Sequence, residues 1–163
     1  MIGFMPEIYP DELLYSRLAR YYERSGYMAY IFAAEDLFQN KNERPDVEFI
    51  NRLTQDAQSV IHKKMSADEV IMNHTMFPYY GRFLGKERRT EAYFALLNTD
   101  GNYRNLLPIP KAKRQRFLRY CPMCVNMDRD KYGETYWHRI HQMQGIDICP
   151  IHFCVLQNTD IAR

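Results

Sequence analysis

Two short segments near the end of the chain decide its fold: Cys121-Pro122-Met123-Cys124 and Cys149-Pro150-Ile151-His152. The first is a Cys-x2-Cys pair and the second is a Cys-x2-His pair, with residues 125–148 between them. Two ligands three positions apart on a tight turn can reach the same ion, and two such pairs complete the tetrahedron that Zn²⁺ accepts from thiolate and imidazole. The spacing therefore predicts one zinc ion bound by the cysteines and the histidine of these pairs.

We expect this zinc site to be structural. All four corners of the tetrahedron would be protein atoms, which leaves no position for water or substrate. The binding free energy then stabilises a part of the chain that is too small to bury much of a core. Three further side chains compete as ligands, namely Cys154, His138 and His141. The alternative interpretations are a small buried thiol for the cysteine, and polar surface groups or phosphate contacts for the histidines.

The cysteine pattern does not match the zinc or thiol enzymes that it most resembles. Zinc deaminases need an upstream His-x-Glu, which this sequence lacks, and Tyr120 rather than proline precedes Cys121. A redox Cys-x-x-Cys favours a strand–helix–strand setting, whereas the flanking residues here are basic and loop-like. The sequence also has no P-loop and no acidic cluster suited to two-metal chemistry. We therefore expect a protein that is not an enzyme.

The segment before the first cysteine pair is strongly basic. Five cations fall within ten residues, and they are Lys111, Lys113, Arg114, Arg116 and Arg119. Residues 1–100 hold 12 Lys/Arg against 15 Asp/Glu, giving −3, whereas residues 101–163 hold 10 against 5, giving +5. Lysine and arginine neutralise phosphates, and arginine can also read guanine edges. The segment predicts a contact with double-stranded DNA, and a solvated connector is the alternative interpretation.

The rest of the chain predicts a mainly α fold. Apolar residues recur at helical spacing in four segments, residues 11–25, 29–38, 47–64 and 86–97. Ser66 and Glu69 form a capping box that opens a short helix to His74, and residues 76–85 are expected to form an ordered loop. Between the two cysteine pairs, Tyr132, Tyr136 and Ile140 predict one helix from Tyr132 to Met143.

Residues 107–110, Leu-Pro-Ile-Pro, mark the expected boundary between two domains. Residues 1–106 would form the helical domain, and residues 107–163 would form a zinc-binding basic subdomain with short strands and one helix. The chain has 163 residues, of which 46% are hydrophobic, enough for one sizeable core or two small ones. It shows no membrane-length apolar run and no signal peptide, so we expect a soluble cytoplasmic protein with reduced thiols and no membrane contact.

At these residues the sequence resembles the TnsD/TniQ family of bacterial transposon target-selection proteins. The resemblance covers nearly the whole chain and rests on motifs in the family's order. They are Pro10-Asp11-Glu12-Leu13-Leu14-Tyr15-Ser16, Phe77-Pro78-Tyr79-Tyr80, Gly85-Lys86-Glu87-Arg88-Arg89, Tyr120-Cys121-Pro122-Met123-Cys124, Tyr132-Gly133-Glu134, Trp137-His138-Arg139, His141-Gln142 and Cys149-Pro150-Ile151-His152. The motif at residues 77–89 favours the TnsD type.

The resemblance implies a sequence-specific DNA-binding protein that marks a fixed chromosomal site. It implies a CCCH zinc site on Cys121, Cys124, Cys149 and His152 that DNA binding needs, and recruitment of an AAA+ ATPase that activates the transposase, together with other transposition proteins. Arg139 joins the basic residues as a candidate DNA contact. A helix-turn-helix among the N-terminal helices is also implied, and the segment from Leu14 to Leu37 is compatible with one.

The resemblance leaves a second function open. Family proteins are usually much longer, so the chain looks like an N-terminal part alone. It could act as an adaptor that docks the ATPase or a guide-RNA effector complex without reading DNA itself. The acidic N-terminal hundred residues and the aromatic segment from Phe77 to Phe83 motivate this alternative.

Overall fold

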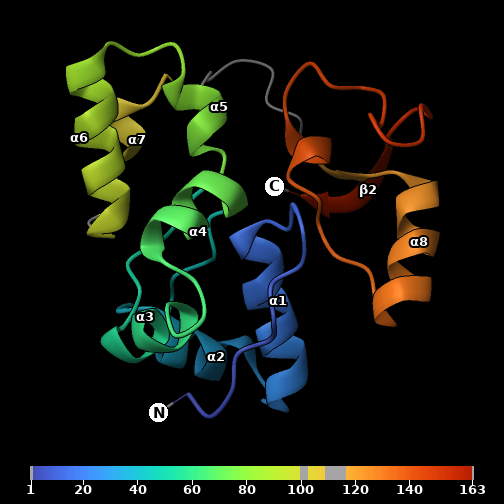
Figure 1. The fold of residues 1–163 in the computed structure, drawn as a ribbon. Coiled ribbons are helices and arrows are strands. Elements are labelled where there is room, and N and C mark those ends of the chain that lie inside the picture. Colours follow the sequence, from blue (N-terminus) through green and yellow to red (C-terminus); the bar gives the residue numbers. More distant parts are fainter. Residues whose placement is uncertain (1, 100–102, 109–116, 163) are drawn as a thin grey trace.

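The computed structural model describes residues 2–99, 103–108 and 117–162, and most of its regular structure is helical (Figure 1). The N-terminal part, residues 2–108, contains α1 (Leu14–Ser25), α2 (Tyr30–Leu37), α3 (Gln55–Ile61), α4 (Ala67–His74), α5 (Phe77–Gly81), α6 (Lys86–Leu97) and α7 (Tyr103–Leu106). The C-terminal part, residues 117–162, contains β1 (Phe117–Tyr120), α8 (Pro122–Tyr132), a 3-10 turn η1 (Ile140–Gln142) and β2 (Gln157–Ala162). The mainly α fold class is confirmed.

The structure contains the helix-end features that the sequence predicted at Gly26 and at Ser66. Gly26 ends α1 with φ +72°, in the left-handed region that glycine enters without a Cβ penalty. Ser66 and Glu69 form the expected capping box at α4, because the Ser66 hydroxyl accepts from the Glu69 amide at 3.2 Å while the Glu69 carboxylate accepts from the Ser66 amide at 2.7 Å. The helix expected over residues 86–97 is α6.

The helix expected over residues 47–64 is shorter than its apolar spacing indicates. The carboxylate of Asp46 accepts from the backbone amides of Glu48 and Phe49, at 2.9 and 3.2 Å, and holds this segment in a turn. Thr54 then caps α3, since its hydroxyl accepts from the Ala57 amide at 3.1 Å. Helical structure therefore begins only at Gln55. In the opposite direction, the expected loop at residues 76–85 contains the short helix α5.

The helix expected from Tyr132 to Met143 is wrong. Helix α8 lies earlier, at Pro122–Tyr132, and ends at Gly133 with φ +78°. Residues 133–139, between α8 and the short turn η1, form no helix, and the backbone of His138 pairs with that of Glu12 in an antiparallel bridge. The overlooked signals were proline at the first helical position and glycine just past the last, which together favour a helix from Pro122 to Tyr132.

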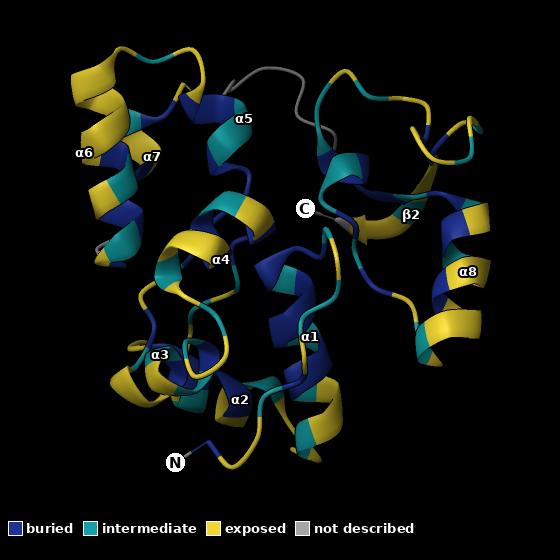
Figure 2. Cartoon of the chain, viewed as in Figure 1, coloured by how far each residue is buried: buried dark blue, intermediate teal, exposed yellow. Residues whose placement is uncertain are grey.

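The main core lies in the N-terminal part, and the C-terminal part adds to it. Buried side chains of the helices and of the segments beside them form it, among them Leu13, Leu14, Leu37, Phe38, Leu53, Ile61, Ile71, Phe77 and Leu96. Trp137 and Met143 of the C-terminal part pack against the same cluster. Figure 2 shows the buried residues concentrated on the inner faces of the helices, with α6 and α8 exposed along their outer faces.

Backbone hydrogen bonds join the two parts. The Leu13 amide donates to the carbonyl of Trp137 at 3.0 Å, and the Arg139 amide donates to the carbonyl of Asp11 at 2.7 Å. The Trp137 amide donates to the Ser16 hydroxyl at 3.0 Å. These contacts tie the start of the chain to residues 137–139. The division into two domains at residues 106 and 107 stays a prediction.

Glu134 of the C-terminal part also contacts the N-terminal part, through polar side chains. Its carboxylate accepts hydrogen bonds from the Tyr9 hydroxyl at 2.7 Å and the Arg20 guanidinium at 2.8 Å. The same guanidinium forms an ion pair with buried Glu12 at 2.7 Å and lies over the Tyr9 ring, 4.2 Å from its centroid. Arg20 therefore links α1 to both acidic side chains.

Within the described residues, none of the helices combines the length and the apolar character that crossing a lipid bilayer requires.

Candidate metal centre

The first pair of cysteines lies at the corner between β1 and α8. Cys121 follows β1 directly and is the N-cap of α8, where its sulfur accepts from the Cys124 amide at 3.4 Å. Pro122 takes the first helical position, where a missing amide proton costs nothing. Cys124 then stands on the first turn and points back toward Cys121. A helix N-terminus also favours thiolate over thiol, because the unsatisfied amides carry positive partial charge.

The second pair lies on a tight hairpin that precedes β2. The Cys149 amide donates to the carbonyl of Cys154, and the Phe153 amide donates to the carbonyl of Cys149, both at 2.9 Å. Phe153 adopts φ +54°, which lets the loop turn sharply enough for Cys149 and His152 to face the same side. Strands β1 and β2 pair antiparallel, with Tyr120 opposite Gln157. This pairing brings the hairpin beside the first cysteine pair.

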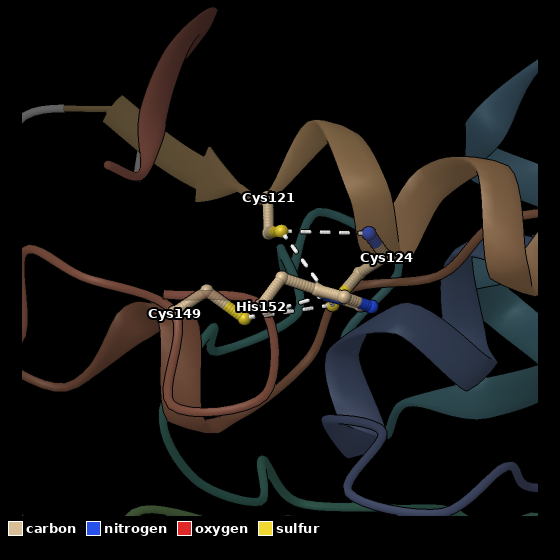
Figure 3. A group of neighbouring side chains, drawn as sticks. All are labelled: Cys121, Cys124, Cys149 and His152. Carbon is tan, nitrogen blue, oxygen red and sulfur yellow. Dashed lines mark hydrogen bonds between the residues drawn. The ribbon is translucent and has the colours of Figure 1, made fainter. Parts of the chain in front are cut away.

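The four predicted ligands converge in space (Figure 3). Their donor atoms all lie within 4.8 Å of one another. The Cys124 and Cys149 sulfurs are 3.7 Å apart, and His152 Nδ1 lies 3.3 to 3.8 Å from the three sulfurs. A tetrahedral zinc ion with Zn–S of about 2.3 Å and Zn–N of about 2.0–2.1 Å sets S–S edges of about 3.8 Å and S–N edges of about 3.6 Å. The donor set therefore fits Zn²⁺ in both chemistry and size.

The same cysteines make up most of the second hydrophobic cluster. It consists of the buried residues Cys121, Cys124, Cys149 and Leu156, with Ile146 and Cys154 packed against it. A cluster this small buries too little apolar surface to offset the entropy of ordering the loops around it. A metal ion at its centre would supply the missing stabilisation, because its binding free energy counts as folding free energy.

The three competing ligands lie around the site at different places. The Cys154 sulfur is 3.2 Å from that of Cys121, but Cys154 is not among the four residues whose donors converge. His141 is buried, and its Nε2 lies 3.8 Å from the Cys124 sulfur. His138 turns away and bonds to the buried carboxylate of Asp128 at 2.8 Å. A sequence pattern alone did not separate these roles, because all three lie close to the ligands along the chain.

Burial shifts the proton equilibria at this centre. It lowers the pKa of His141 to about 3, with further contributions from the positive fields of His138 and Arg119. His141 is therefore a neutral ring, and its Nε2 lies 3.8 Å from the Cys124 sulfur, close enough for a hydrogen bond between them. Burial also raises the pKa of the Cys124 thiol, and the neighbouring sulfurs add to that shift. A bound divalent cation would oppose it by stabilising the thiolate.

We expect the substitution His141→Phe to weaken zinc binding by about 10–100-fold, the usual effect of removing an outer-shell hydrogen bond to a ligand. Phenylalanine keeps an aromatic ring in this buried position but removes the ring nitrogen that lies beside the Cys124 sulfur. Competition with a chromophoric chelator measures the affinity directly. His62→Phe is the matched control, since His62 lies outside the site and contacts the carbonyl of Met65. Equal affinities for the two variants would show that His141 has no influence on the metal.

The candidate DNA contacts are less fully placed. Lys111, Lys113, Arg114 and Arg116 lie outside the described residues. Arg119 is buried, and its guanidinium bonds to the Asp147 carboxylate at 3.0 Å and to the carbonyl of Met143 at 2.7 Å.

Arg139, the remaining candidate, is half-buried. Its guanidinium bonds to Asp11 at 3.1 Å and to the carbonyl of Met72, near the end of α4, at 2.6 Å. Both described arginines thus hold elements of the fold together, and a role of either in DNA binding stays a prediction.

The motifs at both ends of the chain therefore meet around one junction and one candidate metal centre. Comparison with known proteins finds a family whose members share this whole range. The family model of TniQ matches residues 4–156, which include all four candidate ligands and the Glu12–His138 bridge. The chain belongs to the TniQ family. The family expected from the motifs is confirmed.

A curated relative agrees with this assignment. Transposon Tn7 transposition protein TnsD of Escherichia coli is 29% identical to this chain over 152 residues, which is 90% of this chain and 30% of the relative. The chain thus spans less than a third of the length of that protein.

Proposed function

We propose that this chain selects the insertion site of a transposon, by binding double-stranded DNA and by recruiting the AAA+ regulator of the transposase. Family membership over residues 4–156 is the observation that carries the proposal, and the relative named as a transposition protein supports it. The chain would act without catalysing a reaction itself. Other transposition proteins would join the assembly through the AAA+ regulator.

One structural Zn²⁺ would support DNA binding by fixing the fold of the residues that carry its ligands, which come directly after the basic segment in sequence. The ion would be held by Cys121, Cys124, Cys149 and His152, whose donors have the required spacing. Arg119 lies on β1, directly before the first ligand, and its backbone amide bonds to the Gln142 side chain at 3.0 Å. Loss of the ion would therefore release strand β1, which carries the last cation of the basic segment.

We expect the double substitution Arg114→Glu and Arg116→Glu to abolish binding to a duplex that carries the insertion site. Two reversed charges remove two phosphate contacts and add repulsion. Fluorescence anisotropy measures the affinity, and a salt series on the native chain should show log K falling linearly with log salt, as phosphate contacts predict. Circular dichroism checks that the variant stays folded.

A matched control reverses two exposed cations of the N-terminal part, Lys41→Glu and Lys63→Glu. It changes the net charge by the same amount and should leave most of the affinity intact. If the Arg114 and Arg116 reversals bind DNA as tightly as the native chain does, the basic segment is not the contact. Separate reversals of Arg119 and Arg139 need a stability measurement beside them, because both guanidinium groups make internal bonds.

A second candidate function is that of an adaptor, which docks the ATPase or a guide-RNA effector complex without reading DNA. A groove between α4 and α6 favours a protein contact, because its exposed apolar lining is rimmed by cations. Co-purification of the chain with the ATPase in the absence of DNA, combined with no measurable affinity for the duplex, would select this function. The two roles are compatible within one chain.

A further inference from the structure

A groove of about 550 Å³ opens on the N-terminal part. Helix α6, which lines it, lies on the side of the N-terminal part away from α8 and β2 (Figure 1). It lies between α4 and α6, and residues of α5 and of the turn that follows it also line it. Its lining residues are Asp68, Met72, Phe77, Leu84, Lys86, Arg89, Thr90, Tyr93 and Phe94. The volume is in the range of about 300–1,000 Å³ that is typical of sites that enclose a ligand or a few anchoring side chains.

The floor of the groove is apolar and partly open to solvent. Phe77 is buried at its base, Met72 and Leu84 are half-buried, and the ring of Phe94 is 51% exposed. Tyr93 spans the groove from α6 and donates to the Asp68 carboxylate on α4 at 3.0 Å. An aromatic ring held half in solvent beside an apolar base gains free energy when a partner covers it. These residues therefore offer anchoring positions for apolar side chains.

The rim on α6 is basic. Lys86 and Arg89 are exposed and stand on the same face of α6, three positions apart. Neither forms an ion pair within the described part of the chain. The neighbouring Arg88 differs, since it donates to the carbonyls of Leu106 and Asn105 at 2.8 and 3.2 Å and so holds α7 against α6. The fold thus uses Arg88 and leaves Lys86 and Arg89 available to a partner.

We propose that this groove docks an acidic amphipathic helix of a partner protein. Apolar side chains of that helix would fill the base beside Phe77 and Phe94, and its carboxylates would pair with Lys86 and Arg89. Such helices present anchors at positions i, i+3 or i+4, and i+7. DNA fits less well, because a phosphate backbone would satisfy the two cations and leave the aromatic base uncovered. The proposal rests on the recruiting half of the proposed function, to which it assigns a surface and a ligand chemistry.

The test uses the full chain and a display library of random 16-residue peptides. Peptides selected on the native chain are synthesised with a fluorescent label, and their affinities are measured by anisotropy. We expect the selected peptides to combine apolar residues at helical spacing with at least two Asp or Glu. The substitutions Lys86→Glu and Arg89→Glu together should weaken their binding by about tenfold or more. Phe94→Ala should weaken it as well, through lost apolar contact.

Two controls separate specific charge pairing from general effects. Lys41→Glu with Lys63→Glu changes the net charge equally but lies outside the groove, and it should leave peptide affinity unchanged. A peptide whose acidic residues are replaced by lysine should fail to bind the native chain and should bind the Lys86→Glu and Arg89→Glu variant. This charge exchange distinguishes a direct pairing from a loss of folding.

Several outcomes would overturn the proposal. They are the absence of any enriched peptide, enrichment of peptides without acidic residues, and equal binding to the native chain and the groove variant. A duplex that loses affinity when Lys86 and Arg89 are reversed would also overturn it, by assigning the surface to DNA. Duplex binding measured on the same variants keeps the two proposals apart. If the duplex binds and no peptide does, the groove proposal alone fails, whereas peptide binding without duplex binding rejects DNA selection alone.

Discussion

The substitution Cys124→Ser should release the metal ion and unfold the C-terminal part of the chain. Serine keeps the size of the side chain but removes a thiolate from a tetrahedron in which His152 Nδ1 and the Cys149 sulfur lie 3.3 and 3.7 Å from it. Structural zinc in small domains contributes about 10–16 kcal/mol of apparent binding free energy, far more than the small cluster around it can supply by burial. The native protein should carry one zinc per chain by elemental analysis, and the variant should carry none.

The ring signals of Tyr136 and Trp137 report the folding of this region, by near-ultraviolet circular dichroism or by NMR. Both residues lie in the C-terminal part, and Trp137 is the single tryptophan of the chain. Cys154→Ser is the matched control, and it should retain the ion and the signals because Cys154 stands outside the converging set. A native chain without zinc, or a Cys124→Ser variant with unchanged signals, would reject the metal centre. Loss of zinc from Cys154→Ser would revise the ligand set.

The second large effect is expected at the junction between the two parts of the chain. Glu12→Ala removes the carboxylate that pairs with the Arg20 guanidinium, and both side chains are nearly inaccessible to solvent, with exposures of 0% and 9%. Removing one partner of a buried ion pair typically costs about 3–5 kcal/mol, because the remaining charge stays buried without compensation. Glu134 still contacts Arg20, so we expect the lower end of that range. Urea unfolding at neutral pH measures the change.

Two comparisons make this measurement specific. Lys64→Ala breaks the exposed ion pair of Lys64 with Glu7 and should leave the midpoint nearly unchanged, since solvent screens that pair. Adding Arg20→Met to Glu12→Ala removes the buried charge itself and should recover part of the lost stability. If Glu12→Ala unfolds at the same urea concentration as Lys64→Ala, the buried pair does not hold the junction. Zinc content should stay at one per chain in all of these variants.

Features that depend on residues a few positions apart were predicted correctly from the sequence, whereas features that depend on distant segments were not. The capping box at Ser66 and Glu69 needs atoms only three residues apart, so the sequence predicted it and the structure contains it. The helix expected from Tyr132 to Met143 failed because apolar spacing does not show what the side chains contact. Tyr132 and Tyr136 do lie together, with centroids 6.0 Å apart, but both surround Tyr9 from the start of the chain.

The basic residues show the same limit. In the sequence, Arg119 and Arg139 are indistinguishable from exposed cations. In the structure their guanidinium groups bond to Asp147 and Asp11, together with backbone carbonyls. A count of charges cannot distinguish a cation that holds the fold from one that faces a ligand, because the acceptors belong to segments distant in the chain.

The sequence by itself determined the family, the mainly helical class and the four residues that converge on a candidate zinc site. Ligand pairs three positions apart on a turn meet for local steric reasons, whatever the rest of the chain does. The tertiary structure alone decided that Glu12 pairs with Arg20 beside Glu134, that His141 rather than His138 faces Cys124, and that α4 and α6 leave a groove with a basic rim. Those contacts depend on which distant segments pack together, and that choice is made by burial summed over the whole fold rather than by any single stretch of residues.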